Sequence, residues 1–193
     1  MKNGFFAMVS RMKYINRWAL MRNEHSENLY EHSFEVSVIA HALAVIGNKR
    51  FGKNLDGERA ALLGLYHDTP ETLTGDMPTP VKYYSEEVRL AYKTVEENAC
   101  RSLVEMLPED FREDFAPMLI PEEKDAELWK LVKAADKISA LIKCNEERKA
   151  GNTEFIKAGE GIKDSIDAMG IPEAKVFIEE FLPAFDLTLD ELR

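Results

Sequence analysis

An adjacent histidine and aspartate, His67 and Asp68, carry the strongest chemical signal in the sequence. They close a run over residues 57–68 that is apolar on nearly all sides, so its helix should lie in the middle of the domain. Pro70 disfavours helical geometry at the residue before it and places the pair at the C-terminal end of that helix. An unpaired carboxylate costs several kcal/mol in an apolar interior, so we expect a cation beside Asp68. A helix cap or a solvated surface pair is the simpler alternative.

Two further residues could complete a metal site with this pair. Asp136 interrupts an apolar helical pattern, where its alternative role is a salt bridge to a lysine, and His32 opens another, where a lone histidine would more often cap or pack. Together the residues supply two imidazoles and two carboxylates: His32, His67, Asp68 and Asp136. Such a mixed nitrogen and oxygen set fits a divalent transition metal better than calcium, and it leaves octahedral positions open for water and substrate.

The spacing of apolar residues predicts the helices that must position these groups. They cover residues 32–46, 57–68, 88–103 and 129–147, and a last helix starts near Pro172. Gly47 and Asn48 are expected to end the first of them. Residues 74–80 hold one glycine and two prolines and should form a stiff loop without regular structure. Since no segment alternates with the period of a strand, we expect one all-α domain over residues 1–193.

Composition and charge restrict the class of protein. The chain has 193 residues, of which 45% are hydrophobic and 31% charged, as expected for one soluble globular domain. Its formal net charge of −10 argues against polymeric nucleic acid as a partner, because such binders present a large basic surface. A phosphate ligand would therefore be small and held locally by a metal ion and one or two placed cations.

The apolar segments are too short for a membrane or a secretion signal. No stretch approaches the ~20 apolar residues that span a bilayer, and the cluster over residues 5–9 is shorter than a signal-peptide core. The two cysteines, Cys100 and Cys144, lie in apolar helical patterns and should be buried free thiols. We therefore expect a cytoplasmic protein with no membrane contact.

The order of a histidine, a His-Asp pair and a distant aspartate resembles the metal site of the HD-domain superfamily. Further segments make the chain look like the bacterial 5′-deoxynucleotidases. They are Arg17-Trp18, Glu31-His32-Ser33, His67-Asp68-Thr69-Pro70-Glu71, residues 74–82, Asp136 and the closing residues 187–191. The Thr74-Gly75-Asp76 loop together with Arg17-Trp18 makes the likeness specific. Tyr30 and Met77 depart modestly from the pattern and leave the ligand set intact.

The resemblance implies an all-helical HD-domain enzyme that hydrolyses deoxyribonucleoside 5′-monophosphates to deoxyribonucleosides and phosphate. Members are dimeric and require a divalent metal, with cobalt a good activator. The resemblance therefore implies a homodimer that uses water activated by a divalent cation, with Co²⁺ the expected ion in vitro and Mn²⁺, Mg²⁺ or Zn²⁺ as alternatives. The base preference, the physiological metal and the pathway role stay open.

The residue types near the predicted ligands agree with this chemistry. Arg17 can grip two phosphate oxygens through its planar fork, and Trp18 offers a flat wall for sugar or base unless it is a core aromatic. Glu71 lies four residues after His67, within reach of the attacking water, which it could position or deprotonate. Asp76 could protonate the leaving 5′ oxygen or hold the 3′ hydroxyl, and its alternative is a plain turn residue.

Substrate contacts follow from the same resemblance, and we expect Trp18 together with Met77 and Pro78 to crowd the 2′ position of a ribonucleotide. The predicted substrate-binding residues are Arg17, Trp18, His32, Asp68, Asp76, Met77, Pro78, Thr79 and Asp136. The predicted catalytic residues are Arg17, Glu71 and Asp76.

Two other functions remain possible from the residues. A different HD enzyme acting on nucleoside triphosphates, cyclic dinucleotides or alarmones would favour more basic residues than this acidic chain offers. A non-catalytic metal- or nucleotide-binding protein would close the coordination shell and leave no position for water. Phosphate release from a panel of nucleotides, with and without added metal, separates all three.

Overall fold

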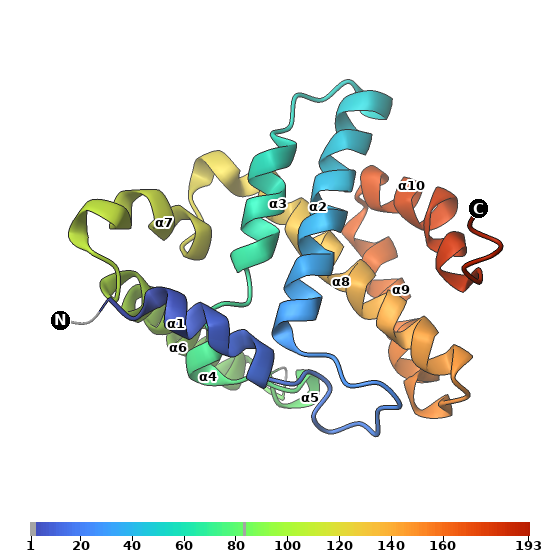
Figure 1. The fold of residues 1–193 in the computed structure, drawn as a ribbon, viewed down its shortest axis with the longest axis horizontal. Coiled ribbons are helices and arrows are strands. Elements are labelled where there is room, and N and C mark those ends of the chain that lie inside the picture. Colours follow the sequence, from blue (N-terminus) through green and yellow to red (C-terminus); the bar gives the residue numbers. More distant parts are fainter. Residues whose placement is uncertain (1–2, 83) are drawn as a thin grey trace.

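A computed structural model describes residues 3–82 and 84–193, and helices build this part of the chain, without a strand among the described residues (Figure 1). The α-helices are α1 Phe5–Val9, α2 Leu29–Phe51, α3 Gly57–Tyr66, α4 Glu71–Thr74, α5 Thr79–Lys82, α6 Glu86–Glu105, α7 Arg112–Leu119, α8 Ala126–Lys149, α9 Ile156–Met169 and α10 Pro172–Glu180. The predicted all-α class is confirmed. No helix of the described residues is both long and apolar enough to cross a membrane.

Helices α2, α3 and α8 pack together at the centre and form the main core (Figure 1). Their facing side chains are almost wholly buried, as Leu43, Leu63 and Ile138 illustrate. Removing a leucine side chain from water contributes about 1.5–3 kcal/mol, so these contacts fix the three helices relative to one another. The predicted metal ligands therefore lie on, or directly after, the three helices that form the main core.

A second apolar cluster lies to one side, where α1 and α7 cover α6. Its buried members are Phe5, Cys100, Leu103, Leu107 and Leu119. Both cysteines are buried free thiols, as predicted. This cluster supports α6, against which α4 and α5 pack.

Helix α2 begins and ends at well-defined caps, and its end differs from the prediction. Asn28 accepts hydrogen bonds from the first-turn amides and Glu31 completes a capping box, while the helix runs on to Gly52, whose φ is 65°. Gly47 lies inside the helix instead of ending it. A Cβ atom there would lie 2.6 Å from Leu55 Cδ1 and 2.9 Å from Glu173 Oε1, so glycine is needed for close packing.

Helix α3 ends where the sequence predicts, but its apolar residues are not all buried. Asp56 caps the helix, its regular part stops at Tyr66, and a turn carries the chain to Pro70. The helix lies in the middle of the domain against α2 and α8, as predicted, but one of its apolar sides is open, because Leu62 and Leu65 are 39% and 40% exposed.

Residues 74–80 are less irregular than predicted. Gly75, with φ of 74°, ends α4, and no regular structure follows until Pro78. Thr79 and Pro80 nevertheless open α5, which corrects the loop prediction. A proline is tolerated in a first helical turn because its missing amide would have no helical partner there.

Candidate active site

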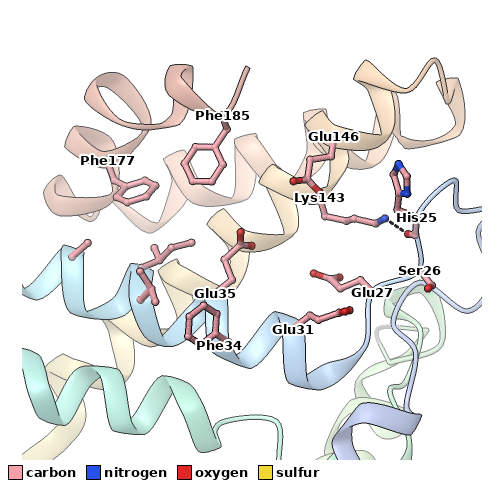
Figure 2. Close-up of a pocket in the computed structure, with 13 residues that line it drawn as sticks. His25, Ser26, Glu27, Glu31, Phe34, Glu35, Lys143, Glu146, Phe177 and Phe185 are labelled. Atoms are coloured by element: carbon pink, nitrogen blue, oxygen red, sulfur yellow. Dashed lines mark hydrogen bonds between the residues drawn. The ribbon is translucent and has the colours of Figure 1, made fainter. Parts of the chain in front are cut away.

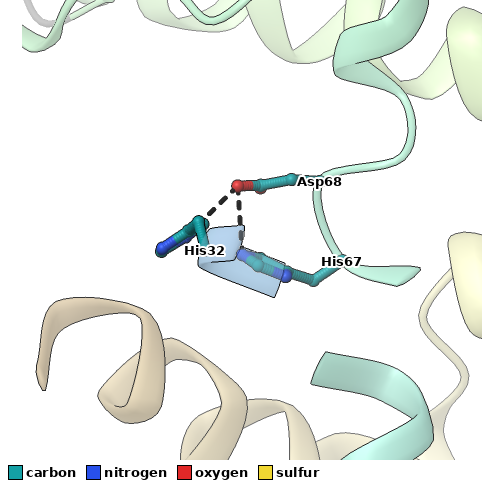
Figure 3. Close-up of side chains that lie close together, drawn as sticks. All are labelled: His32, His67 and Asp68. Carbon is teal, nitrogen blue, oxygen red and sulfur yellow. Dashed lines mark ion pairs between the residues drawn. The ribbon is translucent and has the colours of Figure 1, made fainter. Parts of the chain in front are cut away.

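Three of the predicted ligands meet where the turn after α3 approaches α2. His67 Nε2 lies 3.1 Å and His32 Nε2 lies 3.5 Å from Asp68 Oδ2. Figure 3 shows the Asp68 carboxylate facing both imidazole rings. One nitrogen from each ring and one carboxylate oxygen all lie within 4.8 Å of one another, a spacing that a single ion could span.

The hydrogen bonds of the two rings test whether this cluster fits a metal. His67 Nδ1 lies 2.7 Å from the carbonyl oxygen of Gly64, so Nδ1 carries the proton and Nε2 keeps its lone pair. Among the described residues, Nε2 of His67 and Nε2 of His32 are both buried without a hydrogen-bond partner. Two buried imidazole nitrogens that make no hydrogen bond and face carboxylate oxygens are the donor set of a divalent transition-metal site, so the residues fit the metal.

Asp136 joins the cluster from α8 but stands at its edge. Its Oδ1 lies 3.1 Å from His32 Nε2 and 3.7 Å from Arg17 Nη2, and the side chain is 40% exposed. The partners of its carboxylate among the described residues are thus a histidine and an arginine, and the alternative of a lysine salt bridge is wrong. Exposure on one side leaves room for solvent or substrate next to the cluster.

Arg17 reaches the same cluster from the segment between η1 (Ser10–Tyr14) and α2. Its Nη1 lies 2.9 Å from Glu27 Oε2 and 2.7 Å from His32 Nδ1. Burial alone would lower the pKa of Arg17, but the carboxylates of Glu27, Asp136 and Asp68 outweigh it and raise the pKa above its ordinary value. The guanidinium therefore stays charged among acidic groups.

Trp18 has the strained backbone that often accompanies functional sites. Among the described residues, Trp18 is the only one other than glycine whose φ is positive, at 60°. Its indole Nε1 donates to Glu27 Oε2 at 2.9 Å, and its ring lies 5.3 Å from that of Phe155. Trp18 is therefore partly a packing residue, and Glu27 holds both Trp18 and Arg17 in place.

A buried carboxylate on α8 anchors the chain segment that carries Arg17, and sequence reasoning missed it. The amides of Glu24 and His25 donate to Glu147 at 2.9 and 3.1 Å, Asn152 Nδ2 donates at 2.8 Å, and Lys143 forms an ion pair with it. Burial alone would raise the pKa of Glu147, but the hydrogen bonds led by that from Lys143 lower it to about 2. The i,i+4 spacing of Lys143 and Glu147 within an apolar helix was the available signal.

Glu71 and Asp76 differ from the ligand carboxylates in their protonation. Burial, reinforced by Asp68 and Asp76, raises the pKa of Glu71 to about 10, and its Oε2 is buried without a hydrogen-bond partner among the described residues. Burial also raises the pKa of Asp76, although Arg17 and a hydrogen bond from the Trp18 amide oppose the shift. Both groups are suited to carry protons.

The ligand carboxylates have the opposite shift. Burial alone would raise the pKa of Asp68 and that of Asp136, but His67 lowers the first and His32 lowers the second. The site thus pairs two ionised carboxylates with two acids whose pKa values are raised, a division typical of acid–base catalysis.

The remaining predicted substrate contacts lie along the chain after Asp76. Met77 and Pro78 are partly buried, whereas Thr79 is exposed at the start of α5. The Lys82 ammonium lies 4.9 Å above the Tyr92 ring and 2.8 Å from Glu96 Oε1, which ties the end of α5 to α6. The segment is held at both ends.

Two residues behind His32 were not predicted from the sequence. Ser139 on α8 is buried, and its Oγ lies 3.1 Å from His32 Nδ1 and donates to Glu35 Oε2 at 2.5 Å. Glu35 projects from α2 into a groove of about 560 Å³ between α2, α8 and α10, which Phe34, Phe177 and Glu146 also line (Figure 2). Ser139 follows Asp136 by one helical turn, but nothing in the local sequence links it to a histidine 107 residues away.

Comparison with known proteins gives relatives over nearly the full chain. A profile of the 5′-deoxynucleotidase YfbR-like family matches residues 4–185. A 5′-deoxynucleotidase from Vibrio cholerae is 50% identical over 97% of this chain and 97% of its own length. The 5′-deoxynucleotidase YfbR from Escherichia coli is 48% identical over 97% of this chain and 94% of its own length.

Solved structures share the fold at lower identity. An HD-domain phosphohydrolase from Listeria innocua superposes with a TM-score of 0.81, at 23% identity, over 94% of this chain and 87% of that chain. A cyanophage S-2L HD phosphohydrolase bound to dA and one catalytic Zn²⁺ ion superposes with a TM-score of 0.62, at 17% identity, over 92% and 95%. At these identities the likeness establishes the helical HD-domain architecture.

Proposed function

The chain belongs to the 5′-deoxynucleotidase YfbR-like family, and from this premise we propose how its site works. It is an HD-domain 5′-deoxynucleotidase, which hydrolyses deoxyribonucleoside 5′-monophosphates to deoxyribonucleosides and phosphate. The observation that carries the site assignment is the meeting of His32, His67 and Asp68, with both Nε2 atoms buried, without a hydrogen bond among the described residues and facing carboxylate oxygens.

We propose that a divalent metal is held by His32, His67, Asp68 and Asp136. The donor set supports a transition metal, and so does the one catalytic Zn²⁺ ion bound by the phage HD phosphohydrolase, which shares the fold. Co²⁺ is the proposed activator in vitro, with Mn²⁺, Mg²⁺ and Zn²⁺ as the other ions to test. When bound, such an ion lowers the pKa of a coordinated water and neutralises charge on the phosphoryl group.

Arg17 supplies the cation that attracts and orients the phosphate. The surroundings are otherwise rich in carboxylates, so a phosphate dianion would be repelled without a charged group aimed at it. The planar guanidinium offers parallel N–H donors that match two phosphoryl oxygens, and Glu27 restrains its orientation from 2.9 Å away. Holding the phosphate in one orientation lowers the entropy cost of an in-line attack.

Glu71 and Asp76 divide the proton transfers. Glu71 positions the attacking water through its protonated carboxyl, or deprotonates that water once a bound cation has lowered the raised pKa of Glu71. Asp76 protonates the departing 5′ oxygen or holds the 3′ hydroxyl. Two observations support an acid role for Asp76. Its pKa is raised, and it lies directly before Met77 and Pro78 in the chain, within hydrogen-bond reach of the Trp18 backbone. Uncatalysed monoester hydrolysis is so slow that several such contributions must act together.

We assign selection of the deoxy sugar to a rigid surface formed by Trp18 and the Met77-Pro78 segment. The strained Trp18 backbone, its indole bond to Glu27 and the Met77-Pro78 segment, fixed between Gly75 and α5, support a surface that does not yield to a 2′ hydroxyl. Thr79 at the start of α5 completes the proposed contact surface. The identity of the base should matter little for the rate.

We further propose a cytoplasmic homodimer whose 193 residues form one catalytic domain, with no nucleic-acid polymer or membrane as partner. Large apolar side chains on α2 and α3 support a self-association surface: Phe34 is 67%, Val38 53%, Leu62 39% and Leu65 40% exposed. Two buried free thiols support a reducing compartment.

The decisive experiment measures phosphate release from dAMP, dTMP, AMP, UMP and dATP by protein stripped with a chelator and then reloaded with one metal at a time. We expect no turnover without metal, hydrolysis of both deoxymonophosphates with Co²⁺, and little with the ribonucleotides. Preference for dATP would favour a triphosphate-cleaving HD enzyme, and metal binding without any turnover would favour the non-catalytic alternative.

A further inference from the structure

The two proposed histidine ligands differ in the group that could accept a proton from Nδ1. A histidine that binds a metal through Nε2 must carry its proton on Nδ1, and that proton needs an acceptor. For His67 the acceptor is the backbone carbonyl of Gly64, 2.7 Å from Nδ1. A backbone acceptor is fixed by α3 itself, so His67 is set for ligation by local structure.

His32 has no backbone carbonyl in this role among the contacts of the described residues. Its Nδ1 has two close neighbours, Arg17 Nη1 at 2.7 Å and Ser139 Oγ at 3.1 Å. A guanidinium can only donate, so it can satisfy Nδ1 only when that atom carries no proton. A serine hydroxyl can accept, so of the two it is the one that can receive an Nδ1 proton.

The direction of the Ser139 hydroxyl is fixed by a carboxylate. Ser139 Oγ donates its single proton to Glu35 Oε2 at 2.5 Å, which leaves its lone pairs for the ring of His32. If Glu35 were missing, the hydroxyl would be free to donate to Nδ1 and would favour the other tautomer.

We propose that Ser139 and Glu35 are positioning residues that select the metal-binding tautomer of His32, through a chain in which Nδ1–H donates to Ser139 and Ser139 donates to Glu35. The inference rests on the proposed role of His32 as a ligand. It has one consequence for catalysis: a protonated Nδ1 cannot accept from Arg17. Ligation through Nε2 would therefore break the 2.7 Å contact between Arg17 Nη1 and His32 Nδ1, and would leave that donor for phosphate.

This hydrogen-bond chain must be distinguished from a purely structural contact that holds α2 against α8. Both roles predict some loss of stability when the contact is removed, but only the tautomer role predicts a loss of metal affinity that Ser139 and Glu35 share. The test therefore reads Zn²⁺ affinity by competition with a chromophoric chelator, and thermal stability in the presence of chelator.

The variants are Ser139→Ala, Ser139→Thr, Glu35→Ala and the Ser139→Ala/Glu35→Ala double variant. Ser33→Ala is the matched control, because Ser33 on α2 is buried like Ser139 and its Oγ has no hydrogen-bond partner among the described residues. Loss of an outer-sphere partner weakens metal binding by roughly 10- to 100-fold, which is the loss expected for Ser139→Ala. The threonine variant should recover most of the affinity, and Ser33→Ala should bind as the parent does.

The double variant tests whether Glu35 acts through Ser139. The inference predicts that it binds Zn²⁺ no more weakly than Ser139→Ala alone, because the second deletion removes a partner already lost. In Zn²⁺-loaded protein with ¹⁵N-labelled histidine, a slowly exchanging Nδ1–H resonance of His32 should be present in the parent and lost in Ser139→Ala. Additive losses, equal losses in Ser33→Ala, or parent-like affinity of Ser139→Ala would each overturn the inference.

Failure here and failure of the proposed function are separable. Nucleotide hydrolysis by a parent enzyme whose Ser139→Ala variant keeps full Zn²⁺ affinity would refute the tautomer chain alone. A Ser139-dependent Zn²⁺ affinity in a protein that releases no phosphate would refute the proposed reaction and leave the tautomer chain standing.

Discussion

Replacing Arg17 by lysine tests the phosphate site most directly, because the change keeps the charge and removes only the fork. In the structure the two terminal nitrogens of Arg17 serve different partners: Nη1 lies 2.9 Å from Glu27 Oε2 and Nη2 lies 3.7 Å from Asp136 Oδ1. A lysine ammonium is a single nitrogen and cannot occupy both positions. The substitution should therefore leave one phosphoryl oxygen without its donor.

The size of the effect follows from that missing bond. A hydrogen bond to a charged group contributes about 1.5–3 kcal/mol, which corresponds to a loss of about 10- to 150-fold in kcat/KM. If the bond tightens only in the transition state, kcat should fall by the same factor and KM should change little. Phosphate release from dAMP at saturating Co²⁺ measures both constants.

The control for this experiment is Arg22→Lys, the same chemical change at an exposed position of the same segment. It should keep parent-like kinetics, and metal content should be equal in the two variants. An Arg17→Lys enzyme with kcat/KM within about twofold of the parent would refute the bidentate contact, since a loss that small is below the energy of one charged hydrogen bond.

Three further predictions concern the ligands, the anchor on α8 and the sugar wall. His67→Ala should abolish phosphate release while circular dichroism stays helical, with the exposed His41→Ala as control, and a ligand variant with normal turnover would contradict the assignment. Because the pKa of Glu147 is lowered to about 2 from an ordinary 4.5, its stabilisation is full above about pH 4.5 and is lost as the pH falls. Urea unfolding should therefore show the gap between parent and Glu147→Gln largest at neutral pH and closing towards pH 2; a gap that widens on acidification would contradict this. Trp18→Ala and Pro78→Gly should each reduce the ratio of kcat/KM for dAMP over AMP, which a soft pocket limits to ~10²-fold, and an unchanged ratio in both would remove them from the sugar site.

Sequence patterns misled where the role of a glycine or a leucine depends on contacts outside its own helix. Gly47 indicated a helix end, but close packing of Leu55 and Glu173 against it explains a glycine inside α2. The apolar pattern of residues 57–68 placed the helix in the middle of the domain, but it did not reveal that Leu62 and Leu65 stay partly exposed. Helix α9 was not predicted, and its interior Gly159 and Gly161 weaken the local helical signal.

The sequence by itself determined the helical class, the end of α3 at the His67-Asp68 pair and, through a set of specific motifs, the family. Those features depend on short-range spacing: apolar periodicity, a proline two residues after Asp68, and residue types in a fixed chain order. Only the tertiary structure decided which groups surround His32. Its contact with Ser139 joins residues 107 apart, and the anchor from Glu147 to His25 joins residues 122 apart. Such pairs are fixed by how α2 and the segment before it pack against α8, and packing is a property of the whole core that no local pattern records.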